Sequence, residues 1–385
     1  MRITFILWRG DIGGAERVTV NIAAELRRQG ADARILFICD AARLVGQLEA
    51  CSVPFAALDL ERGSQVLAHP LRLRQALARE RSDLTIAVSV GYLGAALRAA
   101  VPRTRLAGIE HGVLSSIPAE PLLRRAKMRI DRLIGVRAYD AEVAISRYMV
   151  ELVERVPHAR RVVLIPHGVE PAATVAPPQP PHEHEPLVVG FASRLFPGKG
   201  LDRLIGAVAL LARAQPDRRV VVRVAGDGEM RAPWEALARE LGVADRIVFE
   251  GWSDAIAEHW AGCHLAIAPN DGLAESFGMS VLEAMAAARP TIVSDSGALP
   301  ELVRAGATGQ VVAAGDERAL ADAIGRYLRH PAELRAHGAA AHARASAEYS
   351  LARCAGRYLA LAGELTGAPA PVAGLAGRPR AEVGA

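Results

Sequence analysis

Four charged side chains in the second half of the 385-residue chain have types and spacings that suit chemistry on a phosphorylated polyol. Glu275 and Glu283 lie eight residues apart in ESFGMSVLE, and Arg194 and Lys199 lie five apart in SRLFPGKG. A carboxylate can accept hydrogen bonds from two adjacent hydroxyls, as a sugar presents them. Arginine offers a planar fork and lysine a point charge for phosphate. The alternative interpretation is a set of ordinary solvated charges.

The segment that holds the two glutamates also predicts the start of a helix. It follows the apolar run LAIAP, Ser276 is a candidate N-cap, and a helix is expected over 277–288. Glu275 would lie just before this helix and Glu283 about two turns inside it. The first amides of the helix would be free to bind an anion, and they belong to Phe277, Gly278 and Met279.

A glycine-bearing turn, RGDIGGAE at 9–16, follows the first apolar run of the chain. Gly13 and Gly14 would let backbone N–H groups approach an anion at the start of a helix that ends near Gly30. The spacing matches neither G-x-G-x-x-G nor G-x-x-x-x-G-K-[ST]. The turn alone is therefore equally compatible with close strand-to-helix packing.

The elements that must position these residues are short apolar runs alternating with amphipathic stretches. Runs such as ILFI, VVRV and LAIA are apolar on both faces, as in parallel strands covered by helices on both sides. The pattern occurs twice, on either side of PAATVAPPQPPHEHEP at 171–186, which holds six of the 23 prolines. It predicts an α/β fold of two Rossmann-like, doubly wound domains that face each other across a cleft at the carboxyl ends of their strands.

This pattern predicts the organisation of the chain. We expect an N-terminal domain over 1–170, a proline-rich linker over 171–186 and a C-terminal domain over 187–350. A helix over 351–365 could pack back on the first domain, and 366–385, which lacks periodicity, is expected to be a disordered tail. The expected strands are Arg2–Trp8, Ala33–Cys39, Pro54–Leu58, Leu84–Val88, Leu106–Glu110, Glu142–Ser146, Val162–Pro166, Leu187–Ala192, Val220–Ala225, Ile247–Glu250, Leu265–Pro269, Thr291–Ser294 and Gly309–Val312.

Composition and charge narrow the class of protein. Half of the residues (51%) are hydrophobic and 23% are charged, which excludes a wholly disordered chain. The net charge is +4, and the segment up to Pro180 holds 25 basic and 18 acidic residues. Neither a signal peptide nor a membrane span is expected, and aromatic residues are only 4%, so nucleic-acid binding is not expected either.

Two strongly basic segments of the first half, at 64–81 and 121–137, are candidates for docking to an anionic membrane surface. The alternative is that they are solvated helix faces. The basic residues concerned are Arg72, Arg74, Arg79, Arg81, Arg124, Arg125, Lys127, Arg129, Arg132 and Arg137.

The order of the motifs resembles the retaining nucleotide-sugar glycosyltransferases of family 4, which have the GT-B fold. Glu275 and Glu283 form an E-x7-E motif like the hallmark of that family. The other similar segments are GGAE at 13–16, VLIPHGV at 163–169, GFASRLFPGKG at 190–200, VRVAGDGE at 222–229 and VFEGWSD at 248–254.

The resemblance implies a role for each matching residue. Arg194 and Lys199 would neutralise the diphosphate of the donor, Glu275 would bind hydroxyls of its sugar and Glu283 its ribose. His111, in GIEHG, matches a histidine near the donor sugar, although a lone histidine can also be structural. The remaining donor-binding positions are Gly13, Gly14, Gly226, Ser276, Phe277, Gly278 and Met279. The chain departs from the family at Ser193, where glycine is usual, and at His167, where asparagine is common.

The activity that the resemblance implies is retaining transfer of a sugar from a nucleoside-diphosphate sugar to a glycan or lipid-linked acceptor. The first domain would bind the acceptor, and the location would be cytoplasmic, at the inner face of the plasma membrane. The sequence has no D-x-D triplet, so we expect neither a metal nor another cofactor. Two alternatives stay open, a nucleotide-sugar epimerase of the same fold and a non-catalytic nucleotide-sugar-binding protein.

Overall fold

The computed structural model describes most of the chain. The described residues are 1–10, 13–62, 65–66, 68–88, 92–111, 135, 137–155, 161–171, 175–182, 185–253, 255–272 and 275–368. The basic segment 121–137, apart from Gly135 and Arg137, lies outside them, as does the expected tail from residue 369 onward.

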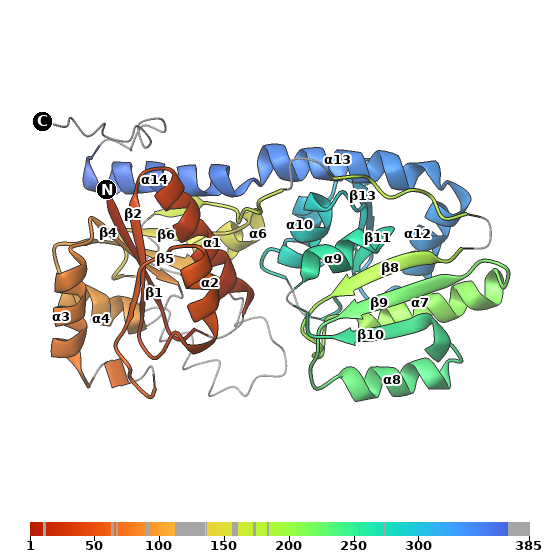
Figure 1. Ribbon diagram of the computed structural model, residues 1–385, viewed down its shortest axis with the longest axis horizontal. Coiled ribbons are helices and arrows are strands. Elements are labelled where there is room, and N and C mark those ends of the chain that lie inside the picture. The colour runs from red at the N-terminus through yellow and green to blue at the C-terminus, as the bar shows by residue number, and fades with distance from the viewer. Residues whose placement is uncertain are drawn as a thin grey trace, which may run out of the picture.

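Two parallel sheets organise the molecule, which has two lobes (Figure 1). The first sheet has the order β3-β2-β1-β4-β5-β6-β7 and the second has β10-β9-β8-β11-β12-β13. Both therefore show the Rossmann order, in which the connections switch direction beside the first strand of each lobe. The strands are β1 (Arg2–Leu7), β2 (Asp32–Phe37), β3 (Phe55–Ala57), β4 (Leu84–Val88), β5 (Arg105–Glu110), β6 (Ala141–Ala144), β7 (Val162–Leu164), β8 (Leu187–Ala192), β9 (Val220–Ala225), β10 (Ile247–Gly251), β11 (Leu265–Ala268), β12 (Thr291–Ser294) and β13 (Gly309–Val312).

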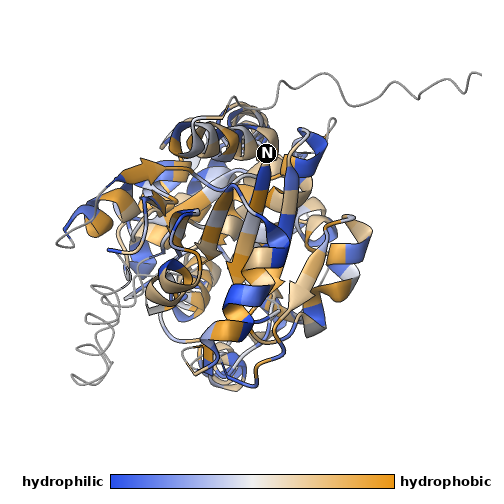
Figure 2. Cartoon of the chain, turned by 90° about the vertical axis from the view of Figure 1, so that its left-hand side faces the viewer, coloured by the Kyte–Doolittle hydropathy of each residue, from blue (hydrophilic) through white to orange (hydrophobic). Residues whose placement is uncertain are grey.

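The helices cover the faces of these sheets and bury their apolar side chains. Strand residues such as Ile3, Phe5 and Ile86 are completely buried, because parallel strands are packed on both faces. Hydrophobic colours predominate in the strands at the middle of the molecule (Figure 2). The described helices are α1 (Gly14–Arg28), α2 (Val45–Ala50), α3 (Pro70–Glu80), α4 (Tyr92–Ala100), α6 (Arg147–Glu154), α7 (Leu201–Ala214), α8 (Arg231–Glu240), α9 (Ile256–Ala261), α10 (Met279–Ala286), α11 (Leu299–Leu302), α12 (Glu317–Arg329), α13 (Ala332–Glu348) and α14 (Leu351–Thr366), with 3-10 turns at Ala42–Leu44 and Ala244–Arg246.

The expected fold class, two Rossmann-like α/β lobes, is confirmed by this arrangement. Each of the thirteen described strands overlaps an expected one, and five of them have the expected bounds. They are Leu84–Val88, Leu187–Ala192, Val220–Ala225, Thr291–Ser294 and Gly309–Val312. Short apolar runs between turn residues therefore located the strands well in this chain.

The chain passes between the lobes at two adjacent places. Val169 and Ser350 form an isolated parallel bridge, with Val169 N donating to Tyr349 O at 2.9 Å and Leu351 N donating to Val169 O at 2.8 Å. Helices α13 and α14 run along one side of both lobes, with α13 against α10 and α14 against α1 (Figure 1). The described residues of the proline-rich segment, 171, 175–182, 185 and 186, lie in no helix or strand. No described helix has the length and apolar character that crossing a membrane requires.

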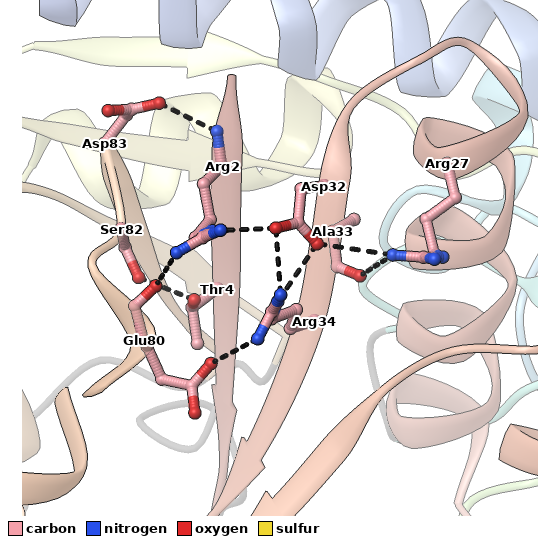
Figure 3. A network of polar contacts seen from close by, with 9 residues as sticks. All are labelled: Arg2, Thr4, Arg27, Asp32, Ala33, Arg34, Glu80, Ser82 and Asp83. Carbon is pink, nitrogen blue, oxygen red and sulfur yellow. Dashed lines mark hydrogen bonds and ion pairs between the residues drawn. The ribbon is translucent and has the colours of Figure 1, made fainter. Parts of the chain in front are cut away.

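A network of ion pairs closes the amino edge of the first sheet, away from the carboxyl ends of its strands (Figure 3). The carboxylate of Asp32 lies 2.7 Å from Arg2 Nε, 3.0 Å from Arg34 Nε and 3.3 Å from Arg27 Nη1. Hydrogen bonds from Arg34 above all, and then from Arg2, hold the pKa of Asp32 below its ordinary value despite partial burial. The charged groups at this amino edge are thus paired with one another. We therefore look for a ligand site at the opposite edge, where the strands have their carboxyl ends.

Candidate functional site

A cavity lies between the two lobes at the carboxyl ends of the strands. Its volume is about 390 Å³, within the range of small-molecule sites. The start of α1 borders it from the first lobe, and the loops after β8 and β9 border it from the second, together with the start of α10. The lining includes the predicted residues Gly13, Gly14, Arg194, Gly226, Met279 and Glu283.

Two helix N-termini border this cavity from opposite lobes. The N-caps of α1 and α10 are Gly13 and Gly278, and neither helix has a side-chain hydrogen bond at its cap. The first amides of a helix have no partner within the helix, and the helix dipole adds partial positive charge there. An anion placed between the two ends would therefore meet N–H donors from both sides.

The start of α10 corrects one prediction. Ser276 is not the N-cap, because the helix begins at Met279 after Gly278, whose φ is +104°. The hydroxyl of Ser276 instead donates to the carbonyl oxygen of His111 in the other lobe, at 2.7 Å. Phe277 is buried, with its ring against those of His167 and Tyr349. Contacts with the other lobe therefore hold residues 276–278 in place, and the spacing of residues along the sequence cannot reveal such contacts.

Lys199 and Glu275 form an ion pair beside the cavity. Lys199 Nζ lies 2.6 Å from Glu275 Oε2, and Asn270 Nδ2 donates to the same oxygen at 2.9 Å. The loop that carries Lys199 lies close to the end of β11, because a Cβ on Gly200, whose φ is +75°, would come within 1.9 Å of Pro269 O. The two residues, which were predicted to bind different parts of a ligand, thus contact each other.

Arg194 is the predicted cation that borders the cavity directly. Its guanidinium carbon lies 5.5 Å from the centre of the Phe196 ring, and Lys199 Nζ lies 5.6 Å from the same centre. Aromatic faces attract cations at such distances, so the ring holds both positive charges on one short loop. Arg194 is exposed and has no carboxylate partner within the described part of the chain.

Glu283, in α10, is partly buried at the edge of the cavity. Burial raises its pKa to about 7, and the positive charge of Arg17 on α1 acts in the opposite direction. Glu283 therefore exchanges its proton near neutral pH. Arg17 and Glu283 line the cavity from the two lobes, so the positive charge of Arg17 favours the ionised form of Glu283.

Two histidines, His111 and His167, lie against each other at the boundary of the lobes, and Phe277 packs against His167. Their nearly parallel rings have centres 5.0 Å apart, and His167 Nε2 lies 3.4 Å from His111 Nδ1. Burial lowers the pKa of His111 to about 4, and burial and the neighbouring His111 keep the pKa of His167 well below its ordinary value. Both rings are therefore neutral at neutral pH.

The structure thus separates the predicted residues into two groups. Six line the cavity, while Lys199, Glu275, His111, Ser276, Phe277 and Gly278 are not among its lining residues. Sequence reasoning missed Arg17, Asn21, Trp252, Ser253 and Ser280, which line it too. Arg17 and Asn21 follow Gly13 by four and eight residues, which is the spacing of one helix face and could have identified them.

No group of three or more His, Cys, Asp or Glu side chains in the described ranges is arranged to hold a metal ion. The polar groups that line the cavity are backbone and side-chain amides, guanidinium groups, serine hydroxyls and two carboxyl groups, of which Glu283 has a raised pKa and Glu170 a lowered one.

Two family models match adjacent parts of the chain. The model "Glycosyltransferase Family 4" matches residues 12–173, and "Glycosyl transferases group 1" matches residues 174–344.

Relatives with known names agree with these models. The mannosyltransferase LpcC of lipopolysaccharide core biosynthesis in Rhizobium leguminosarum bv. viciae is 33% identical over 60% of this chain and 66% of that protein. A D-inositol 3-phosphate glycosyltransferase of Actinosynnema mirum is 33% identical over 63% of this chain and 57% of that protein. The chain thus spans less than two thirds of the length of these two relatives. The Nocardia farcinica protein of the same name is 28% identical over 87% of this chain and 81% of that protein.

Solved structures share the fold. Anabaena Alr3699/HepE in complex with UDP and glucose superposes with a TM-score of 0.78 at 22% identity, covering 95% of this chain and all of that one. Sucrose-phosphate synthase of Thermosynechococcus elongatus gives 0.77 at 20% identity, covering 96% and 100%. With two family models that together run from residue 12 to residue 344 and with two facing Rossmann-like lobes, this chain belongs to the GT4-type glycosyltransferases, with the GT-B fold.

Proposed function

We propose that the protein transfers a sugar from a nucleoside-diphosphate sugar to a glycan or lipid-linked acceptor, with retention of configuration. One observation carries this proposal: two uncapped helix N-termini and Arg194 border the same cavity between the lobes. A diphosphate needs such a concentration of N–H donors and positive charge.

The departing nucleoside diphosphate gains negative charge as its bond to the sugar breaks. Arg194 and the amides that start α1 and α10 would stabilise this charge, since they are fixed in place before the reaction. Single donors of this kind contribute about 3 kcal/mol in acyl-transfer enzymes. Several together could account for a large part of the rate increase, so we propose a reaction that needs no metal and no further cofactor.

The group of Lys199, Glu275 and Asn270 would bind the sugar end of the donor. Glu275 Oε2 already accepts from Lys199 and Asn270, while the carboxylate has further lone pairs for sugar hydroxyls. Lys199 could then turn its charge toward the diphosphate when the donor binds. Glu283 would hold the ribose, which its position on α10 at the cavity permits.

The named relatives support a nucleotide-sugar donor and a glycan product. Three solved structures of HepE are described as complexes with UDP, UDP and glucose, or UDP-glucose. LpcC is named a mannosyltransferase of lipopolysaccharide core biosynthesis. The names of these proteins include different sugars, so the experiment compares several donors.

We also propose that the enzyme works in the cytoplasm at the inner membrane face, where lipid-linked acceptors would be met. The described part of the basic segments supports this, since α3 carries exposed Arg74 and Arg79 together with Leu71, which is 70% exposed. Basic residues near an anionic bilayer contribute about 1 kcal/mol each. Co-sedimentation with vesicles should increase when anionic lipid is added, and equal binding to neutral vesicles would contradict the idea.

Thermal unfolding with UDP, GDP and ADP tests the donor site. A ligand at about 100 times its dissociation constant stabilises the fold by about 2.7 kcal/mol, so one nucleotide should raise the melting temperature clearly. Arg194→Met should remove most of that shift, whereas Arg218→Met, an exposed arginine outside the cavity lining, should leave it intact. The proposal is wrong if no nucleotide stabilises the protein or if both variants respond like the wild type. Transfer from the stabilising nucleotide's sugar, followed by NMR of the anomeric product, then tests retention.

A further inference from the structure

A second cavity lies at the boundary of the lobes, apart from the one proposed for the donor. Its volume is about 220 Å³, and none of its lining residues lines the first cavity. Ser146 and Arg147, at the start of α6, border it from the first lobe, and Glu301 and Leu302 of α11 border it from the second. Drug-sized ligands need about 300 Å³ or more, so this cavity suits a smaller molecule.

Three arginines without a partner border the second cavity. Arg353 and Arg357 lie four residues apart on α14 and therefore share one face of that helix, and Arg147 lies in the first turn of α6. None of the three guanidinium groups has a hydrogen bond or an ion pair with a described residue. Guanidinium groups with free N–H donors bind phosphate oxygens well, because their planar fork matches the spacing of these oxygens.

The two carboxylates at this cavity already have other partners. Glu301 accepts from the first two backbone amides of α6, at 2.9 and 2.7 Å. Glu348 lies 2.6 Å from Arg304 and 3.2 Å from Arg344. The N-terminus of α14 adds partial positive charge, since its N-cap, Ser350, makes no side-chain hydrogen bond. The lining thus holds three free positive charges, while its negative charges are engaged with other groups.

We propose that the second cavity binds a phosphate dianion, free or at the end of a small ester, between Arg147, Arg353 and Arg357. This inference goes beyond the proposed sugar transfer and does not depend on it. Three like charges around one small cavity repel one another, and a dianion that accepts hydrogen bonds from them removes this cost. The proposed donor site uses Arg194 and the first cavity, so the two anions have separate sites.

Ligands in the two cavities should strengthen each other's binding. Both cavities draw their lining from both lobes, so a ligand in either one favours the arrangement in which the lobes are together. One short segment also connects the cavities, since Phe277 lines the second, and Met279 and Ser280 line the first. Coupling between two ligands is reciprocal. Phosphate should therefore tighten the binding of nucleotide, and nucleotide that of phosphate.

Calorimetric titration with inorganic phosphate, at pH 8 and constant ionic strength, tests the site. We expect saturable binding, which Arg353→Met and Arg357→Met each weaken about tenfold, as loss of a charge-assisted hydrogen bond does. Arg335→Met, at an exposed position of α13 outside the lining, should bind phosphate like the wild type, and so should Arg194→Met. Melting temperatures without phosphate should be the same in all variants, which shows that each of them folds.

The proposal is wrong if phosphate does not bind saturably, or if Arg353→Met and Arg357→Met bind it like the wild type. It is also wrong if only Arg194→Met loses phosphate, because the anion would then occupy the first cavity. Glycerol 1-phosphate, titrated in the same way, distinguishes the two sources of the phosphate group. Binding of both compounds supports a small ester as the ligand, and binding of inorganic phosphate alone supports the free anion.

A nucleotide titration with and without phosphate tests the coupling. Phosphate should lower the Kd of the nucleotide several-fold in the wild type and in Arg335→Met, relative to its effect in Arg353→Met. The comparison with Arg353→Met accounts for competition at the first cavity, because Arg194 is intact in all three proteins. An equal effect in all three would overturn the coupling. Phosphate binding itself is measured without nucleotide, so its result holds even if no sugar transfer is found.

Discussion

At the scale of single residues, Glu283 combines burial with a position on the cavity. Its pKa is raised from 4.5 to about 7 because burial disfavours the carboxylate. Between these two values the folded protein holds a proton that the unfolded chain releases. The stability should therefore fall as the pH rises through this window.

Glu283→Gln removes this titration and tests it. At pH 4, below both pKa values, the variant and the wild type should have similar stability, because the side chain is then largely neutral in the folded and in the unfolded chain. At pH 8 the variant should be more stable, by about 1–3 kcal/mol, since the wild type must then bury a carboxylate. Thermal and urea unfolding between pH 4 and 9 measure the difference. A difference that does not vary with pH would show that Glu283 is not held in its neutral form.

The ion pair of Lys199 and Glu275 should stabilise the folded protein before any ligand binds. Its partners are partly buried, with 14% and 25% of their side chains exposed, and they lie 2.6 Å apart. A double-mutant cycle with Lys199→Met and Glu275→Gln should give a coupling of about 1–2 kcal/mol. The same cycle on the more exposed pair of Arg231 and Glu235 should give about 0.3–0.5 kcal/mol. Additive effects at Lys199 and Glu275 would mean that the pair contributes nothing to the resting state.

At the scale of elements, the start of α10 decides where several site residues lie. Gly278 has a φ of +104°, and a Cβ there would come within 2.7 Å of Leu299 Cδ2. Gly278→Ala should therefore destabilise the protein by about 1–3 kcal/mol, through backbone strain and packing together. It should also weaken nucleotide binding by tilting the first turn of α10. Urea unfolding and nucleotide titration measure the two effects.

Gly14→Ala is the matched control for stability. It also lies at the start of a helix, but a Cβ on Gly14 would meet no atom within 4 Å. Since alanine is the better helix former, this variant should be at least as stable as the wild type. Loss of stability in both variants would show that any change at a helix N-terminus is harmful, and that the strain at Gly278 is not special.

The elements also show what the sequence could and could not predict. The strands were found because their apolar runs are short and end at turn residues, as in LTIAV of β4. The predicted start of α10 was two residues too early, because serine is a common N-cap residue and Ser276 was therefore taken as the cap. Its hydroxyl is instead held by the carbonyl of His111, 165 residues away. That Arg17 lies at the same cavity as Glu283 is likewise a relation between the lobes, although its spacing from Gly13 on one helix face could have identified it as a cavity residue.

At the scale of the whole molecule, the cavity exists only while the two lobes stay together. Buried apolar side chains of both lobes, among them Ile109 and Phe277, form one continuous cluster, and hydrogen bonds between the lobes add to it. Ser146 Oγ donates to Ser276 O at 2.7 Å, and the Glu301 carboxylate accepts from Arg147 N and Tyr148 N at 2.9 and 2.7 Å. Glu301, on α11 of the second lobe, thereby satisfies the N-terminus of α6 in the first, where a negative charge is favoured.

Glu301→Ala should therefore loosen the contact between the lobes and leave each lobe folded. Removal of a charged acceptor from two amides costs about 1–3 kcal/mol, enough to populate separated lobes. Small-angle scattering should show a larger radius of gyration, and nucleotide should bind more weakly because its site draws on both lobes. Glu333→Ala is the control, since Glu333 pairs with Arg326 within the second lobe and should change neither quantity. If Glu301→Ala scatters like the wild type but binds nucleotide more weakly, the residue acts on the site by another route. If it expands and binds normally, the donor site belongs to the second lobe alone, and α1 has no part in holding the diphosphate.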